Sequence, residues 1–190
     1  MQVDPDIQLA VAPEPVKKNT FYSSLFEIVE TILLALILYF AIDAVFARVR
    51  VENISMEPTL LPGDVLVVNK IALKLGGLHT GDIVVFHNPN NEAEDYIKRL
   101  IGTPGDKVSV HAGEVFVNGV KLNEKYIAAA PNYEGDWTVP ANSLFVLGDN
   151  RNQSSDSHEW GWVPIKDIVG KALVIYWPFN AMKFITDPYR

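Results

Sequence analysis

The stretch Ser55-Met56-Glu57-Pro58-Thr59-Leu60, closed by Leu61-Pro62-Gly63-Asp64, divides the chain into two unlike parts. The only long apolar segment of the sequence comes just before it, and short β-rich runs follow it. Pro58 forbids a regular helix here, and the Pro-Gly-Asp sequence is typical of a turn. Ser55 in such a segment is a turn residue, a helix cap or a nucleophile, and the segment alone does not decide among these roles.

The apolar segment predicts a transmembrane anchor helix over residues 21–47. Its centre, from Thr31 to Ile42, carries no charge and is apolar on every face. A bilayer core needs about 20 residues of helix, and the window from Leu25 to Phe46 reaches that length if the charges near its ends lie at the headgroups. The alternative is a buried helix of a soluble protein, but a helix that is apolar all round needs a large protein or lipid around it.

We expect this anchor to stay uncleaved, because Arg48-Val49-Arg50 follows it in place of a small-residue cleavage site. Basic residues lie on both sides of it, with Lys17 and Lys18 before and Arg48 and Arg50 after, so the positive-inside bias does not give the orientation. Residues 1–20 lack periodicity and contain several prolines and acids, which predicts a disordered tail.

Residues 48–190 are expected to form a mainly β domain, an antiparallel sandwich or partly closed barrel. Short β-rich runs alternate here with turn signals, and the Asn118-Gly119 pair is a strong signal for a two-residue hairpin. One soluble stretch, from Lys70 to Leu75, has a helical pattern. The expected strands lie at Val65–Val68, Asp82–Phe86, Tyr96–Ile101, Val115–Val117, Val120–Leu122, Ser143–Leu147 and Lys171–Trp177.

Composition excludes several classes of function. The net charge of -7 disfavours nucleic acid as the main partner, because phosphate binding needs a basic surface. There are no cysteines, so disulfides, thiolate chemistry and cysteine-ligated metals are absent. No pair among the four histidines has the i, i+4 spacing of a helical zinc site, and we expect neither a metal nor another cofactor.

Two polar segments stand out from the β-rich background. Lys98 and Arg99 are consecutive in an apolar strand, so one is expected to face solvent and the other to point inward, unless the strand has a bulge. A buried lysine is unfavourable unless it loses its proton, which is the property that a general base needs. Alternatively, both are surface charges on an edge strand. The second segment, from Gly148 to His158, is an exposed turn or a buried network in which Asp156 and Arg151 pair.

Together these segments resemble the type I signal peptidases, also called leader peptidases. The shared motifs are Ser-Met-Glu-Pro-Thr-Leu after a membrane anchor, Gly-Asp-Ile-Val-Val-Phe, Lys-Arg-Leu-Ile-Gly-Thr-Pro-Gly-Asp, and Gly-Asp-Asn-Arg-x-x-Ser-x-Asp-Ser. Each motif is weak alone, but four in this order are highly specific. The resemblance covers the chain from the anchor to about Trp177.

The resemblance implies a serine endopeptidase with a Ser/Lys dyad, in which Ser55 is the nucleophile and Lys98 the general base. It implies an oxyanion hole that uses the Ser55 backbone N–H, to which the Asn53 side chain could add a donor. Ser154 corresponds to a serine that hydrogen-bonds the lysine, while Asp156 and Arg151 correspond to residues that brace the loop. His158 stands where many members carry arginine, which leaves the charge pairing of this loop open.

The implied substrates are the signal peptides of exported preproteins, cleaved after small residues in an A-x-A-like pattern. We expect an extended peptide to add to a sheet edge beside Ser55, with Met56, Ile83 and Val85 lining the pocket. The lipid bilayer is the second expected partner. The family places its catalytic domain on the exoplasmic face, which implies a single-pass protein of the cell membrane with a cytoplasmic N-terminus.

Four alternatives remain open from the sequence. The domain could be an anchored peptide-binding module without chemistry, or a self-cleaving Ser/Lys protease similar to the SOS repressors. A conventional Ser/His/Asp triad that uses His158 is also conceivable, although no spacing selects it. Trp160 and Trp162 either pack in the domain or contact the lipid interface.

Overall fold

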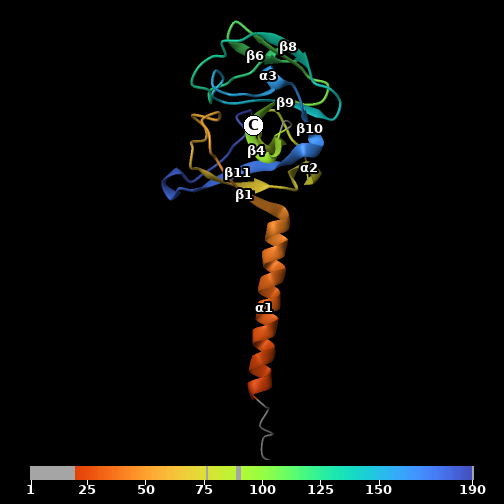
Figure 1. The fold of residues 1–190 in the computed structure, drawn as a ribbon, viewed down its shortest axis with the longest axis vertical. Coiled ribbons are helices and arrows are strands. Elements are labelled where there is room, and N and C mark those ends of the chain that lie inside the picture. The colour runs from red at the N-terminus through yellow and green to blue at the C-terminus, as the bar shows by residue number, and fades with distance from the viewer. Residues whose placement is uncertain (1–19, 76, 89–90, 190) are drawn as a thin grey trace, which may run out of the picture. The chain divides into compact units, whose positions relative to one another are not determined.

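The computed structural model describes residues 20–75, 77–88 and 91–189 (Figure 1). The chain divides into two units, Met1–Ala41 and Ile42–Arg190. The predicted tail lies outside the described residues apart from Thr20, which begins the first helix.

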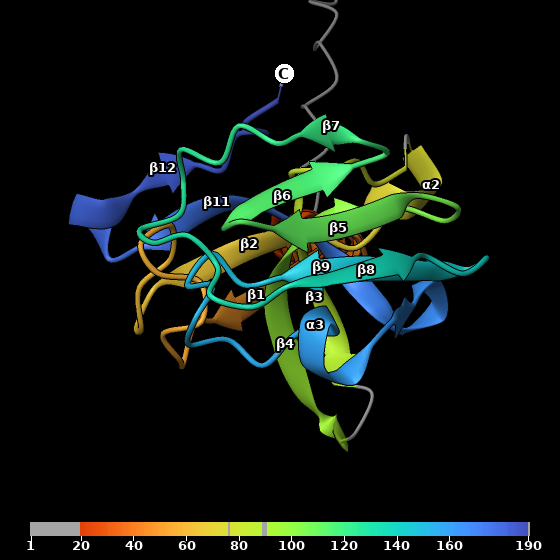
Figure 2. The same ribbon diagram turned by 90° about the horizontal axis from the view of Figure 1, so that it is seen from above.

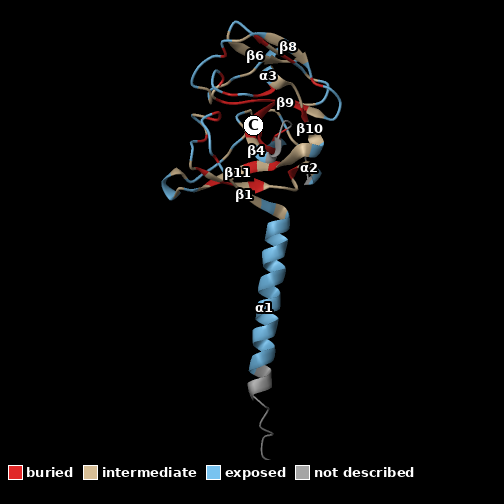
Figure 3. Cartoon of the chain, in the orientation of Figure 1, coloured by how far each residue is buried: buried red, intermediate tan, exposed pale blue. Residues whose placement is uncertain are grey.

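Helix α1 spans Thr20–Val45 and corresponds to the predicted anchor. Its segment Ser24–Val45 is long and apolar enough to cross a membrane, and its side chains are exposed along that window (Figure 3). The helix ends two residues before the predicted boundary. Phe46 and Ala47 belong instead to a strand, where they pair with Asn69 and Val68.

The β unit contains two antiparallel sheets (Figure 2). The first has eight strands in the order β1-β2-β11-β3-β4-β9-β10, with β12 also paired to β11, and the second has four in the order β7-β6-β5-β8. The strands of the first sheet are β1 (Phe46–Arg50), β2 (Val65–Asn69), β3 (Ile83–Asn88), β4 (Asn91–Gly102), β9 (Ser143–Leu147), β10 (Val163–Pro164), β11 (Ile168–Trp177) and β12 (Lys183–Phe184). Those of the second are β5 (Lys107–His111), β6 (Glu114–Val117), β7 (Val120–Lys121) and β8 (Gly135–Thr138).

The mainly β, antiparallel prediction is confirmed, but the sheets do not close into a barrel. Strands β1 and β10 end the order of the first sheet and, among the described strands, do not pair with each other. The β6–β7 turn has the predicted geometry, because Asn118 and Gly119 both adopt positive φ angles, of 52° and 79°. The stretch from Lys70 to Leu75 contains only one helical turn, α2 (Ala72–Leu75). The other helices are equally short: α3 (Ser157–Trp160), and the 3-10 turns η1 (Ile165–Asp167) and η2 (Phe179–Ala181).

Buried apolar side chains cover both faces of the β3–β4 hairpin. One cluster includes Met56, Ile83 and Val85, and another includes Val84 and Leu100. Figure 3 shows the buried residues along these central strands. A side chain from either face of β4 therefore enters protein interior.

The two tryptophans pack within the β unit. Trp160 lies against Phe86, with ring centroids 6.2 Å apart, and Trp162 lies 6.0 Å from Phe145. Both are partly buried against core clusters. This confirms their interpretation as packing residues.

Candidate active site

Ser55 lies in the loop between β1 and β2, and it is only 7% exposed. Asn150 N–H donates to the Ser55 carbonyl oxygen at 3.0 Å, which ties this loop to the polar segment after β9. Gly148 makes that approach possible. A Cβ on it would lie 2.5 Å from the Ser55 carbonyl oxygen and 2.2 Å from Ser154 Oγ. The backbone contact between the two loops thus requires glycine at position 148.

Lys98 projects from β4 toward Ser55. Its Nζ donates to Ser55 Oγ at 2.8 Å, and the residue is 3% exposed. Burial lowers the pKa of Lys98 from 10.5 to about 8, against the charges of Asp156 and Asp149, which raise it. At pH 8 about half of the molecules therefore carry a neutral amine next to the hydroxyl. The structure brings together the two residues that the sequence motifs placed in the dyad.

Arg99 contradicts the expectation that one of the two cations faces solvent. It is 2% exposed, and its Nε and Nη2 donate to the two oxygens of Asp149 at 2.8 and 2.6 Å. Nη1 donates to the Gly81 carbonyl at 2.7 Å, and the guanidinium lies 3.9 Å from the centroid of the Tyr126 ring. Both cations point inward because both faces of β4 are covered by other parts of the chain. Asp149 was missed as its partner, since 50 residues separate the two in sequence.

Asn53 contacts both polar groups of the nucleophile. Its Oδ1 accepts from Ser55 Oγ at 2.8 Å and from Ser55 N–H at 3.3 Å. The expected role was donation from the amide N–H to an oxyanion. In this structure the carbonyl oxygen of the amide, and not its N–H₂ group, points at Ser55. The side chain therefore lies beside Ser55 as expected, but its donor group points away from it.

The segment from Gly148 to His158 contains a buried network, although Asn152, Gln153 and Ser155 are exposed, and its pairing differs from the one expected. Arg151 forms a double hydrogen bond with Glu124, at 2.8 and 2.7 Å, and donates to the Gly148 carbonyl at 3.0 Å. Asp156 accepts from Gly148 N–H at 2.8 Å and pairs with His158. Arg151 and Asp156 therefore hold the same glycine from opposite sides without pairing with each other, because each already has a closer partner.

Ser154 does not make the expected hydrogen bond to Lys98. Its Oγ is buried next to Gly148 and has no hydrogen-bond partner among the described residues. The Lys98 amine instead lies between Ser55 and the Tyr96 ring, 5.3 Å from the ring centroid.

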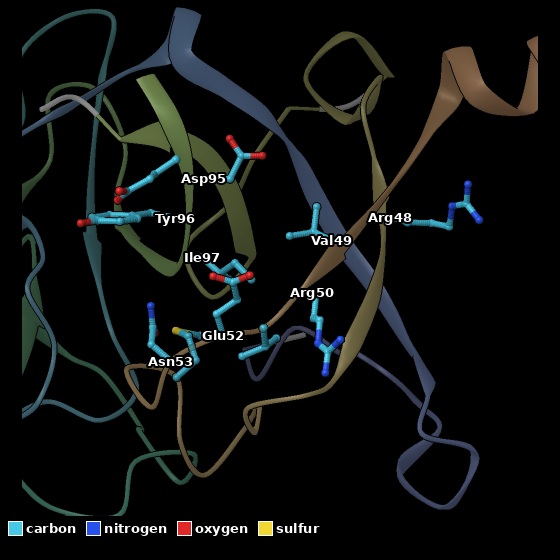
Figure 4. A pocket seen from close by; sticks show the side chains of 11 residues that line it. Arg48, Val49, Arg50, Glu52, Asn53, Asp95, Tyr96 and Ile97 are labelled. Carbon is cyan, nitrogen blue, oxygen red and sulfur yellow. The ribbon is translucent and has the colours of Figure 1, made fainter. Parts of the chain in front are cut away.

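A groove of about 380 Å³ lies beside Asn53 and Tyr96, two residues that also surround the dyad (Figure 4). The segment from Arg48 to Asn53 lines one wall, and the segment from Glu94 to Ile97 lines the other. Met56 is also part of the lining, whereas Ile83 and Val85, which were expected to line the substrate pocket with it, are fully buried in the core. A smaller cavity of about 160 Å³ surrounds the dyad itself and is lined by Asn53, Ile54, Ser55, Tyr96, Lys98, Gln153 and Ser155.

Both walls of the groove present free strand edges. β1 ends the strand order of the first sheet, and among the described strands it pairs only with β2. β4 pairs with β3 along its length, but on its other side it pairs with β9 only from Arg99 to Gly102. Backbone groups near Ile97 are thus available to another extended chain. Within the described residues, no cluster of three or more His, Cys, Asp or Glu side chains is arranged to hold a metal ion.

The chain is similar in sequence to a family of known proteins. The family described as "Signal peptidase, peptidase S26" matches residues 25–177. A signal peptidase I from Leptolyngbya laminosa is 44% identical, with 87% of this chain and 86% of the relative covered. One from Bacillus caldolyticus is 41% identical over 74% of this chain and 84% of the relative. A solved signal peptidase I structure from Enterococcus faecalis has 34% sequence identity and a TM-score of 0.44, and covers 50% of this chain and 95% of that one.

Proposed function

The chain belongs to the signal peptidase family, peptidase S26, and from this we propose that it is a membrane-anchored serine endopeptidase that removes signal peptides from exported preproteins. Ser55 is the nucleophile and Lys98 the general base of this proposal. The observation that carries it is the 2.8 Å approach of Lys98 Nζ to Ser55 Oγ at a buried site, where the pKa of the lysine is lowered to about 8.

The first step is attack of Ser55 Oγ on the carbonyl carbon of the scissile bond. A serine hydroxyl is a poor nucleophile until a base takes its proton. Neutral Lys98 takes that proton as the new C–O bond forms, and then delivers it to the leaving amine as the C–N bond breaks. A water molecule then attacks the ester carbon of the acyl-enzyme while Lys98 takes its proton, and that proton passes to Ser55 Oγ as the bond between Oγ and the acyl carbon breaks. Burial of Lys98 supplies the neutral amine that this cycle needs near pH 8.

The oxyanion of the tetrahedral intermediate would accept from the Ser55 backbone N–H. In the free protein this N–H is engaged by Asn53 Oδ1 at 3.3 Å, a long contact that a substrate carbonyl can displace. Rotation of the Asn53 amide would then present its N–H₂ group to the same oxyanion. Asn53 is thus proposed as a second donor that becomes available on substrate binding.

The substrate would bind as an extended strand between the two free edges of the groove. Its backbone would pair with the segment around Ile97 and with the residues on either side of Val51, whose own N–H and carbonyl are bonded to Asp64 and Gly63, and alternate side chains would enter the cavities. The cavity at the dyad, about 160 Å³, accommodates a small side chain beside Ser55. This supports cleavage after small residues in an A-x-A-like pattern.

Helix α1 would anchor the β unit to the bilayer. Ser55 follows the last residue of α1, Val45, by only ten positions in sequence. A short tether of this kind raises the effective concentration of a substrate held in the same membrane. A cytoplasmic N-terminus and an exoplasmic catalytic unit, as the family resemblance implies, complete the proposal.

The test is cleavage of a preprotein by full-length protein in detergent. Ser55→Ala and Lys98→Ala are each expected to lower kcat/KM by about 10³-fold or more, since each removes one half of the dyad. Lys166→Ala, at a lysine whose side chain is 81% exposed, is the matched control and should cleave like the wild type. Near wild-type cleavage by either dyad variant would refute the proposal, and an internal cut in the wild-type chain, seen by mass spectrometry, would favour a self-cleaving protease.

A further inference from the structure

A cavity of about 370 Å³, the loop cavity, lies over the polar segment after β9 and is not used by the mechanism above. The dyad cavity shares Asn53 and Tyr96 with the groove, and it shares Gln153 and Ser155 with the loop cavity. The groove and the loop cavity have no lining residue in common. The dyad cavity therefore lies between the other two, and the three follow one another along the surface past the nucleophile.

The segment between the dyad cavity and the loop cavity alternates like a strand. Gln153 and Ser155 are exposed and line both cavities, whereas Ser154 and Asp156 are buried. Gln153 Oε1 accepts from Asn150 Nδ2 at 3.2 Å. Its N–H₂ group has no partner among the described residues, so it is free to donate to the backbone carbonyl of a chain that passes between the two cavities.

Contacts within the protein hold the walls of the loop cavity in place. Asn152 Nδ2 donates to the Ala130 carbonyl at 2.9 Å, and its Oδ1 accepts from Asn132 N–H at 2.9 Å, so this side chain ties the two segments together. The Tyr133 and His158 rings, stacked with centroids 3.8 Å apart, form another part of the lining. The cavity is thus formed before any ligand enters it, as is usual for binding sites.

The lining of the loop cavity is polar and carries one exposed fixed charge. Arg151 is fully buried, and its guanidinium forms a double hydrogen bond with Glu124. The Glu159 side chain is 54% exposed, and its Oε1 lies 3.8 Å from His158 Nε2, which is too long for a hydrogen bond. A chain that enters this cavity therefore meets a carboxylate that no lysine or arginine of the described residues pairs with.

A substrate whose scissile carbonyl lies at Ser55 Oγ has to enter and leave the dyad cavity as an extended chain. In the function proposed above, the groove with its free strand edges takes the residues before the scissile bond. We propose that the loop cavity binds the residues after the scissile bond, and that Glu159 makes it selective for basic over acidic side chains there. This inference rests on the proposed function of the Ser55/Lys98 dyad.

The lining residues also indicate which part of the leaving chain each one meets. Gln153 and Ser155 line both cavities, so the first residue after the scissile bond passes beside them. Glu159 lines only the loop cavity, so it faces a later residue. The selected positions are therefore expected among the second, third and fourth residues of the mature protein.

The test uses preproteins that differ only by Lys, Gln or Glu at one of these three positions. At the most sensitive position, kcat/KM of the wild type is expected to be about fivefold higher with Lys than with Glu, the size of effect that an exposed ion pair gives. Glu159→Gln should bring this ratio close to one, and Glu159→Lys should reverse it. Each ratio compares two substrates of the same variant, so a general change in activity or folding cancels.

Asp136→Lys is the matched control. Asp136 is an exposed carboxylate of the second sheet and lines none of the three cavities, so this charge reversal should keep the wild-type ratio. Raising the ionic strength to about 1 M, where charges are screened beyond about 3 Å, should bring the wild-type ratio towards one. The same exchanges placed before the scissile bond should not respond to Glu159→Lys.

The length of the leaving chain gives a second measurement that does not depend on charge. Peptides that continue for four residues after the scissile bond should have a kcat/KM about tenfold higher than peptides that continue for one, because binding away from the reacting bond adds to transition-state stabilisation. Equal values for the two lengths would contradict binding in the loop cavity.

The outcomes distinguish this inference from the proposed function. If Ser55→Ala and Lys98→Ala are inactive but the Lys/Glu ratio is the same in the wild type, Glu159→Gln and Glu159→Lys, the dyad stands and the inference is overturned. A response of Glu159→Lys to residues before the scissile bond would also overturn it, because the two ends of the path would be exchanged. Activity in either dyad variant would instead remove the function on which the inference rests.

Discussion

Lys98 and Arg99 are neighbours on β4 and both are buried, yet they meet opposite electrostatic surroundings. Arg99 lies in a double hydrogen bond with the buried carboxylate of Asp149, which outweighs burial and raises its pKa. Lys98 has a hydroxyl as its nearest partner and only more distant carboxylates, so burial dominates and lowers its pKa to about 8. A paired buried cation stays charged and serves structure, whereas an unpaired one is held ready to lose its proton.

Breaking the Arg99 pair should have the largest effect on stability. Asp149→Ala leaves a buried guanidinium without its counter-ion, which is expected to destabilise the protein by about 3 to 5 kcal/mol. Denaturant unfolding in detergent measures this change. Asp136→Ala is the control, because its partner His111 is exposed, and it should change the free energy of unfolding by about 0.5 kcal/mol or less. Equal effects of the two variants would contradict the contrast drawn here.

Removing the Lys98 amine should stabilise the protein while abolishing activity. Its pKa is lower in the folded protein than in the unfolded chain, so the unfolded chain binds more protons between about pH 8 and 10.5 and stability rises over that range. Lys98→Met is therefore expected to be more stable than the wild type by up to about 3 kcal/mol below pH 8. The difference should shrink as the pH approaches 10.5, and unfolding curves at several pH values measure it. A destabilised Lys98→Met at neutral pH would contradict the account.

The smallest expected effect on stability comes from the hydrogen bonds of Tyr126, whose ring lies over Arg99. The Tyr126 hydroxyl is hydrogen-bonded to Glu124 at 2.9 Å and to the Tyr189 hydroxyl at 2.7 Å. Tyr126→Phe removes both bonds but keeps the ring over Arg99, and a loss of about 1 kcal/mol is expected. The acid limb of the pH profile of activity should not move, because these hydrogen bonds belong to the surroundings of the paired cation. A shift of that limb would show that the two environments are coupled.

Features that depend on short stretches of sequence could be predicted. The apolar run, the turn residues and the β-rich runs were enough to predict α1 and most central strands, and the motif resemblance placed Ser55 and Lys98 in one dyad. Strands β5 and β8 were missed because their short runs mix polar and apolar side chains. Strand β1, which continues directly from the apolar run, and the two-residue strands β10 and β12 were also missed.

The partners of the buried arginines could not be predicted, because they depend on contacts between segments far apart in sequence. Arg99 and Asp149 are 50 residues apart, and Arg151 and Glu124 are 27 apart, so no local pattern links them. The resemblance named Arg151 and Asp156 as bracing residues, but it could not give their partners. Those pairings depend on the register of β4 with its neighbouring strands and on what covers its two faces. Both follow from the tertiary fold.

An NMR titration of the Lys98 amine in the full-length protein tests the central claim most directly. With ¹³C-labelled lysine in detergent, the signal absent from Lys98→Met identifies the ε-carbon of Lys98. The account predicts a midpoint near pH 8 for this signal, with the exposed lysines titrating near the ordinary value of about 10.4. A Lys98 midpoint at that ordinary value would contradict it.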